Sequence, residues 1–350
     1  MSHSFSDFYR GKRVLVTGHT GFEGGWAVAW LKLLGAQVCG YGLPPATRPN
    51  FFDATILDRG MTSIFGDIRD RNSLANTFTE LQPEIVIHCA QINPTQSLHE
   101  PVDAFSTNLM GTVHILEEAR LTPSMRAMVL VSSGACADRQ TRAAHDGKEC
   151  DLYRASMESA EIARCAFNKS FFQKTKVAVA TARIADAIGG GDWRKGRIVP
   201  DLVRGLTAAE EVVSKKEKQR ELKVWHVLEP VRACLLLARN LFERGQKSAG
   251  IWDFAPGDHV RISPSSFCEK FIAFWNQPEA AGQDNAFKAP ASAKPNPPQA
   301  QTETMGWSCA LSPDQALAWT VEWYRGFCTD PASTLRTTHE QIERYMRMSA

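Results

Sequence analysis

The chain has 350 residues, 43% of them hydrophobic, which is enough for one large core or two smaller ones. Its 40 basic and 38 acidic residues leave a net charge of +2, so no global field favours nucleic acid or an anionic membrane as a partner. Nine scattered cysteines without CxxC spacing argue against a disulfide framework or a metal site. The sequence shows no apolar core of a signal peptide and no apolar run near the roughly 18 residues of a membrane span, so we expect a cytoplasmic protein.

Short apolar segments alternate with helical patterns from residue 8 to about 185. The expected strands cover 13–17, 37–41, 62–65, 84–88, 127–132 and 176–180. The expected helices cover 24–34, 73–81, 102–119 and 151–171. Near-continuous apolar strands separated by helices are typical of a parallel sheet that is buried on both faces. We therefore predict an α/β fold, a doubly wound parallel sheet of the Rossmann type, over residues 8–185.

The rhythm of the sequence changes after the sixth expected strand. Segments become shorter and less periodic, so residues 186–330 are predicted to form a smaller substrate-binding lobe. An apolar helix over 228–244 is expected to return to the first domain, and the Pro/Ala-rich stretch 286–300 predicts a loop. A final amphipathic helix is expected over 312–327, followed by a C-terminal tail, 331–350.

A glycine loop follows the first expected strand and opens the first helix. Its glycines have GxxGxxG spacing, at Gly18, Gly21 and Gly24, with Thr20 and Phe22 between them. One glycine permits a tight turn, one lets the backbone approach a pyrophosphate, and one lets the helix pack on the strand. The helix N-terminus then faces the phosphates. We predict that these five residues bind a dinucleotide; the alternative is an ordinary turn between a strand and a helix.

The second expected strand ends at 41–43 without the acidic residue that would bind an adenine ribose. Arg48 follows a few residues later, so NAD is the expected cofactor and NADP stays open. Asp67 and Ile68, after the third expected strand, are candidates for contact with adenine. Asp67 is equally well placed to be the N-cap of the next helix.

Further motifs are spread over most of the chain, from residue 8 to about 327. They are GKRVLVTGHTGFEGGW (11–26), YGLPP (41–45), GMTSIFGDIRD (60–70), QPEIVIH (82–88), the stretch 101–112, IGGGDW (188–193), HVLEP (226–230) and TVEWY (320–324). With these motifs the sequence resembles the extended short-chain dehydrogenase/reductases and, among them, most closely the CDP-glucose 4,6-dehydratases.

This resemblance implies a nucleotide-sugar substrate, possible linkage of that sugar to CDP, and a reaction in three steps. In the family, a tyrosine removes the proton of the sugar 4-hydroxyl while NAD+ takes the hydride from C4. An acid and a base then expel water across C5 and C6, and the hydride returns to C6. The tyrosine aligns with Tyr153 and its hydroxyl partner with Ser132, so these two are the predicted catalytic residues.

The sequence departs from the family at three catalytic positions. The lysine that follows the tyrosine aligns with Met157, and the acid and the base align with Gly134 and Ala135. Because a free phenol has a pKa of about 10, only about one tyrosine in a thousand is ionised near neutrality without the lysine. Neither Gly134 nor Ala135 carries a group for general acid–base chemistry. We therefore expect altered or reduced chemistry.

The resemblance also implies substrate-binding residues, here Asn108, Arg183, Arg197 and Trp193. The arginines are expected to bind a diphosphate, and Trp193 to pack within the lobe. For Arg197, a surface salt bridge is an equal alternative. The family's asparagine after the sixth strand aligns with Asp186, whose charge would repel a diphosphate.

Three functions remain open on the sequence. The first is an NAD(P)-dependent nucleotide-sugar enzyme, which the glycine loop, Tyr153 and Ser132 favour. The second is a non-catalytic homologue that binds NAD or a sugar nucleotide as a regulator or partner, which the three departures favour. The third is a structural dimer that binds nothing small, against which the intact glycine loop argues. In the family, helices matching 102–119 and 151–171 pair two subunits, so a homodimer is expected.

Overall fold

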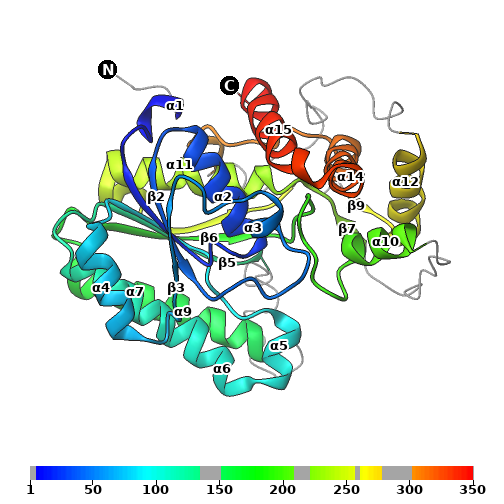
Figure 1. Cartoon of the computed structure of the whole chain (residues 1–350). Coiled ribbons are helices and arrows are strands. Elements are labelled where there is room, and N and C mark those ends of the chain that lie inside the picture. The colour runs from blue at the N-terminus through cyan, green and yellow to red at the C-terminus, as the bar shows by residue number, and fades with distance from the viewer. Residues whose placement is uncertain (1–4, 135–150, 209–220, 257–260, 278–301, 350) are drawn as a thin grey trace.

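The computed structural model describes residues 5–134, 151–208, 221–256, 261–277 and 302–349. Within these ranges, seven parallel strands form one sheet in the order β3-β2-β1-β4-β5-β6-β8 (Figure 1). The strands of this sheet are β1 (Arg13–Thr17), β2 (Gln37–Gly42), β3 (Thr62–Phe65), β4 (Ile85–His88), β5 (Ala127–Ser133), β6 (Ala178–Ile184) and β8 (Gly250–Phe254). A separate antiparallel pair joins β7 (Leu222–Lys223) to β9 (Arg261–Ile262). The expected doubly wound sheet is confirmed.

Helices cover both faces of the sheet, and further helices form a lobe beside it (Figure 1). The α-helices are α1 (Phe5–Phe8), α2 (Phe22–Leu33), α3 (Phe51–Ala54), α4 (Arg71–Leu81), α5 (Pro94–His99), α6 (Pro101–Phe105), α7 (Thr112–Leu121), α9 (Leu152–Phe167), α10 (Ile198–Thr207), α11 (Leu228–Arg244), α12 (Pro264–Asn276), α14 (Pro313–Thr329) and α15 (Thr334–Met348). The π-helical turns are η1 (Ser106–Gly111) and η3 (Asn168–Phe172), and the 3-10 turns are η4 (Gly245–Ser248) and η7 (Pro331–Ser333). None of these helices is long and apolar enough to cross a membrane.

Alternation along each strand divides the core into two layers. Val14 and Val16 of β1 point into the layer that holds α2 and α11, whereas Leu15 between them points into the layer that holds α4 and α7. Because side chains alternate across a strand, one run of apolar residues supplies both layers. This explains why the strands appear in the sequence as continuous apolar runs.

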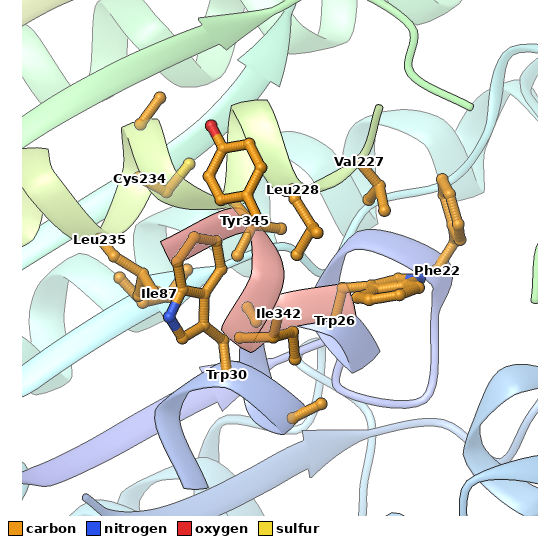
Figure 2. Close-up of a cluster of buried hydrophobic side chains, with 14 of the residues drawn as sticks. Phe22, Trp26, Trp30, Ile87, Val227, Leu228, Cys234, Leu235, Ile342 and Tyr345 are labelled. Atoms are coloured by element: carbon orange, nitrogen blue, oxygen red, sulfur yellow. The ribbon is translucent and has the colours of Figure 1, made fainter. Parts of the chain in front are cut away.

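The larger layer is built around two tryptophans on α2. Trp26 and Trp30 are fully buried, and Figure 2 shows them with side chains of α11 and with Tyr345 of α15. Trp30 meets the ring of Tyr345 edge to face, with centroids 5.5 Å apart. The helix that follows the glycine loop is therefore held by elements from the far end of the chain.

Three features of the fold differ from the expectations. Strand β8 was not foreseen; it pairs with β6, so the chain returns to the main sheet from within 186–330. The expected tail, 331–350, instead contains α15, which packs on α2 and α14 because an apolar stripe through Ile342 and Tyr345 is buried. The helix expected over 102–119 is interrupted by the π-helical turn η1. Helix α11, which covers 228–244, contacts β4, β5 and β6 of the main sheet.

A buried carboxylate joins α11 to the C-terminal segments. Glu229 is fully buried and accepts hydrogen bonds from the backbone amides of Ala310 and Leu311, each at 2.8 Å. The hydroxyl of Tyr345 donates to its other oxygen at 2.5 Å. Burial raises the pKa of Glu229 to about 7, although these three hydrogen bonds act in the opposite direction.

This pKa predicts a specific pH dependence of stability. A folded-state pKa raised from 4.5 to about 7 means that the native chain binds this proton more tightly than the unfolded chain. The contribution is therefore complete below pH 4.5 and is lost as the pH rises towards 7. We expect Glu229→Gln to remove this loss, which amounts to about 3 kcal/mol. Urea unfolding at both ends of this pH range measures it.

The wild-type chain is the control, because the buried histidines make the same pH-dependent contribution to stability in the wild type and in Glu229→Gln. Burial lowers the pKa of His19 and His88 to about 4 and that of His226 to about 3, so their contribution to stability is lost as the pH falls. A stability difference between wild type and Glu229→Gln that stays constant with pH would contradict the assignment.

Candidate functional site

A cleft of about 470 Å³ opens at the carboxyl ends of the parallel strands. The cleft is lined by residues at or just beyond the ends of four strands: Gly18 after β1, Ala90 after β4, Ser132 near the end of β5 and Ala185 after β6. The strand order reverses between β1 and β4, so the cleft lies at the topological switch point of the sheet. Ligands of open α/β sheets bind at this place because the connections diverge there.

The glycine loop forms one wall of the cleft through very close backbone contacts. Gly18 has φ +70°, and a Cβ there would lie 2.8 Å from the backbone nitrogen of Ala90. A Cβ at Gly24 would lie 2.3 Å from the carbonyl oxygen of Gly18. Helix α2 begins after Gly21 without a side-chain cap, which leaves its first amides available to a ligand. Residues 18 and 20–22 line the cleft, and their geometry fits a pyrophosphate.

The far end of this wall is apolar. Leu43, Pro44 and Ala46 line the cleft beyond β2, whereas Arg48 is exposed and does not line it. Asp67 and Ile68 do line the cleft.

The carboxylate of Asp67 accepts hydrogen bonds from the side chain and the backbone amide of Arg69. The N-cap of α4 is Asp70, so the N-cap alternative for Asp67 is wrong.

Tyr153 and Ser132 both line the cleft, from α9 and the end of β5. The hydroxyl of Tyr153 donates to Gln91 Oε1 at 3.2 Å. The hydroxyl of Ser132 donates in another direction, to Glu161 Oε1 at 2.9 Å. Met157 is buried one helical turn beyond Tyr153 and lines a separate small cavity behind the cleft.

Arg183 is not a diphosphate ligand in this structure, contrary to the sequence prediction. Its side chain is only 3% exposed and does not line the cleft. Its Nε donates to Glu161 Oε1 at 2.8 Å, and a second nitrogen bonds the other oxygen of that carboxylate. Arg183 Nη1 also lies 3.5 Å from Asp253 on β8. Glu161 on α9 therefore holds Arg183 in a buried ion pair, away from the cleft.

Asn108 is likewise an internal residue, which corrects its assignment to the substrate. Its side-chain oxygen accepts from the amide of Ile92 at 2.9 Å, and its nitrogen donates to Ser156 at 2.8 Å. These bonds tie η1 to α9 and to the loop after β4. Trp193 packs within the lobe, as the sequence predicted, against the rings of Tyr324 and Phe327.

Two arginines, Arg194 and Arg197, also line the cleft. Arg197 Nη1 lies 2.9 Å from Asp186 Oδ2, so in this structure Arg197 forms the salt bridge that was the alternative to phosphate binding. Arg194 was not singled out from the sequence; it forms two hydrogen bonds with Asp192, each 2.8 Å long, and lies 5.8 Å from the ring centroid of Phe22. The signal for Arg194 was its place directly after the GGGDW motif. A carboxylate partner balances each guanidinium.

The backbone leaves no room for a side chain at Gly134. A Cβ there would lie 2.9 Å from the backbone nitrogen of Ala185. Ala135 lies outside the described residues, as does the Pro/Ala-rich loop at 286–300.

His88 is structural, as expected, because Thr17 and Thr112 bond its two ring nitrogens and burial lowers its pKa to about 4. Across the described ranges, no group of His, Cys, Asp and Glu side chains is arranged to hold a metal ion.

Comparisons with known proteins agree with this geometry. The model of the NAD dependent epimerase/dehydratase family matches residues 14–249. The chain is 36% identical over 281 residues to the CDP-glucose 4,6-dehydratase of Salmonella typhimurium, covering 77% of this chain and 78% of that protein. It is 28% identical over 249 residues to the dTDP-4-dehydro-6-deoxy-D-allose reductase of Streptomyces bikiniensis, covering 66% of this chain and 74% of that protein.

Two solved structures support the fold. A UDP-glucose 4-epimerase from Thermotoga maritima, crystallised with UDP-glucose, superposes with a TM-score of 0.68 at 19% identity, covering 90% of this chain and 99% of that chain. The Bordetella bronchiseptica enzyme WbmF, in complex with NAD+ and UDP, superposes with a TM-score of 0.68 at 16% identity, covering 95% of this chain and 98% of that chain.

The glycine loop yields a prediction with a matched control. Gly18 and Gly60 have nearly the same φ, +70° and +74°, but a Cβ at Gly60 meets nothing within 4 Å. We expect Gly60→Ala to cost about 1–2 kcal/mol in stability from backbone strain alone. Gly18→Ala adds a clash with Ala90 and should also weaken NAD+ binding at least about tenfold, or about 1.4 kcal/mol. Calorimetric titration with NAD+ and urea unfolding separate the two effects; equal NAD+ affinities would contradict the prediction.

Proposed function

Because the chain belongs to the NAD dependent epimerase/dehydratase family, we propose that it transfers hydride between NAD and a sugar nucleotide without the dehydration step. NAD is the cofactor, in keeping with the family and with the glycine loop at the switch point of the sheet. The apolar residues Leu43, Pro44 and Ala46 favour NAD over NADP, because they offer no charge to a 2′-phosphate.

One observation carries this proposal: the cleft keeps two hydroxyls but excludes a side chain at Gly134. Ser132 and Tyr153 line the same cleft as the glycine loop, so both are placed to hold a sugar hydroxyl beside the nicotinamide position. A carboxylate at 134 would collide with the backbone of Ala185. Reductase and epimerase activities, which occur in the names of relatives, require hydride transfer but no acid–base pair at C5 and C6.

The two arginines that line the cleft support a diphosphate-linked substrate. Arg194 and Arg197 each hold a carboxylate in this structure, and both line the cleft. A diphosphate offers a guanidinium the same charge-assisted, bidentate bonds as a carboxylate. To bind beside Arg197, it would have to displace Asp186, whose side chain is exposed. The relative with 36% identity supports a CDP-linked sugar as the first candidate.

A non-catalytic role in binding NAD or a sugar nucleotide, as a regulator or partner, is the second candidate. It is supported by the apolar side chain of Met157 at the position that the resemblance gives to lysine. Incubation with CDP-glucose and NAD+, followed by mass spectrometry of the sugar, distinguishes the candidates. We expect NADH and a sugar that has lost two hydrogens. Loss of water would refute our proposal, and a sugar unchanged in both mass and configuration, without NADH, would favour the second candidate.

Restoring the lysine tests the chemistry directly. Met157 is buried one turn from Tyr153, and the small cavity beside it also contains the carboxylate of Glu161. Met157→Lys would place an ammonium near Tyr153, and each unit by which it lowers the phenol pKa raises the ionised fraction tenfold. We expect about a 10- to 1,000-fold faster NADH formation from CDP-glucose. Met157→Leu, which preserves bulk without charge, should not accelerate it; equal rates for the two variants would contradict the prediction.

We further propose that the chain forms a homodimer in the cytoplasm. The dimer surface consists of exposed apolar residues on α5, α6, η1 and α9, elements that contact one another (Figure 1). These residues are Leu98, Val102, Met110, Leu152 and Ile162. Val102 is 78% and Ile162 70% exposed, as expected where a partner covers apolar side chains. A reducing compartment suits the seven described cysteines, all of which are free.

Charge on the dimer surface should separate the subunits. We expect Ile162→Lys to convert a dimer into a monomer, because a second copy would have to bury an unpaired ammonium. Phe65, 57% exposed on β3, lies outside the dimer surface, so Phe65→Lys is the control and should leave the dimer intact. Light scattering after size-exclusion chromatography measures both; a wild-type monomer would contradict the proposal.

A further inference from the structure

Ser132 lies between two spaces. It lines the large cleft and also a neighbouring small cavity of about 20 Å³. The cavity is also lined by Met157, Glu161 and Thr181, and its volume is sufficient for one water molecule. The hydroxyl of Ser132 therefore connects the place where a substrate would bind to buried polar groups that a substrate cannot reach.

The hydrogen bonds give the two hydroxyls opposite roles. Ser132 donates its only hydroxyl proton to Glu161 Oε1 at 2.9 Å, so its oxygen can serve the cleft only as an acceptor. The hydroxyl of Tyr153 donates to the amide oxygen of Gln91 at 3.2 Å. Tyr153 is thus arranged as a hydrogen-bond donor. Ser132 is arranged to accept a proton from the cleft and to transfer its own hydroxyl proton to Glu161.

We propose that Glu161, acting through Ser132, accepts the proton of the sugar hydroxyl. This inference rests on the proposed hydride transfer and names the residues that replace the tyrosine–lysine pair. The sugar O–H proton moves to Ser132 Oγ while the Ser132 proton moves to Glu161 Oε1. The C–H bond breaks, its electron pair leaves as hydride to NAD+, and a C=O bond forms. Carbon is oxidised, NAD+ is reduced, and the proton remains on the Glu161 carboxyl.

The charges around Glu161 are compatible with this transfer. Arg183 holds both carboxylate oxygens of Glu161, which is only 7% exposed, so the buried carboxylate has a cationic partner. When Glu161 takes the proton, Asp253 still lies 3.5 Å from Arg183 and offsets its charge. Arg164 on α9 is a second buried cation near Glu161, and burial keeps the nearby His88 neutral by lowering its pKa to about 4.

Thr181 contributes a buried hydroxyl to the same cavity. Its hydroxyl is buried, with 1% of the residue exposed, and lacks a hydrogen-bond partner within the described part of the chain. A buried hydroxyl without a partner costs about 1–3 kcal/mol. A water molecule in the cavity would bond Thr181 and solvate the carboxyl that Glu161 becomes.

The test is the rate of NADH formation from CDP-glucose by the full chain, measured across pH. General-base catalysis contributes about 100- to 10,000-fold, so we expect Ser132→Ala and Glu161→Gln to lose at least about 100-fold. Glu161→Asp should recover part of this loss. Tyr153→Phe removes one neutral hydrogen bond and should lose only about tenfold. The pH dependence of the wild-type rate should be altered in Glu161→Gln and retained in Tyr153→Phe.

Two controls keep folding separate from chemistry. Ser132→Ala leaves the Glu161–Arg183 ion pair in place, so it should bind NAD+ in calorimetry as the wild type does. Infrared difference spectra on reduction should show a protonated carboxyl that Glu161→Gln abolishes. The inference fails if Tyr153→Phe abolishes NADH formation while Ser132→Ala stays within about threefold of wild type. If the wild-type chain binds NAD+ but forms no NADH, the proposed function fails as well.

Discussion

The contact between β1 and α2 determines where everything else in the molecule can lie. Helix α2 begins so close to the carbonyl oxygen of Gly18 that a Cβ at position 24 would come within 2.3 Å of it. The same helix carries Trp26 and Trp30 into the aromatic core, where α11 and α15 close around them. The helix that presents its amides to the cleft is therefore anchored by segments from the far end of the chain.

The sequence predicts those parts of the fold that local pattern determines. The bounds of β1 and β3 match the expected ranges, and the glycine loop is recognisable because its spacing reflects backbone geometry within a few residues. Strand β8 was not predicted because Gly250–Phe254 is a short segment that becomes a strand only through its pairing with β6. Helix α15 has few apolar residues, and the burial of Tyr345 depends on Trp30 and Glu229, which are more than a hundred positions away.

The site shows the same division more sharply. Phosphate-binding glycines act through their own backbone, so sequence alone locates them. A charged side chain acts through whatever lies opposite it, and Arg183 is the example: a carboxylate on α9 holds it inside the protein. Arg194 was overlooked for the converse reason, because its place in the cleft depends on the turn that carries Asp192. The sequence does not distinguish the buried Arg183 from the cleft-lining Arg194, because their positions depend on the carboxylates that pair with them.

Of the three departures from the family pattern, those at 157 and 134 lie within the described residues, and they differ in what their reversal would require of the backbone. At 157, a side chain already occupies the position, so an exchange alters charge while the backbone stays in place. At 134, the backbone of β5 approaches Ala185 too closely for any side chain, so restoring a carboxylate requires the β5 and β6 ends to move apart. In the proposed function, oxidation and dehydration are therefore separate. The proposed hydride transfer needs only a proton acceptor beside the cleft, for which we propose the Ser132–Glu161 pair, whereas a carboxylate at 134 has no space between the strand ends.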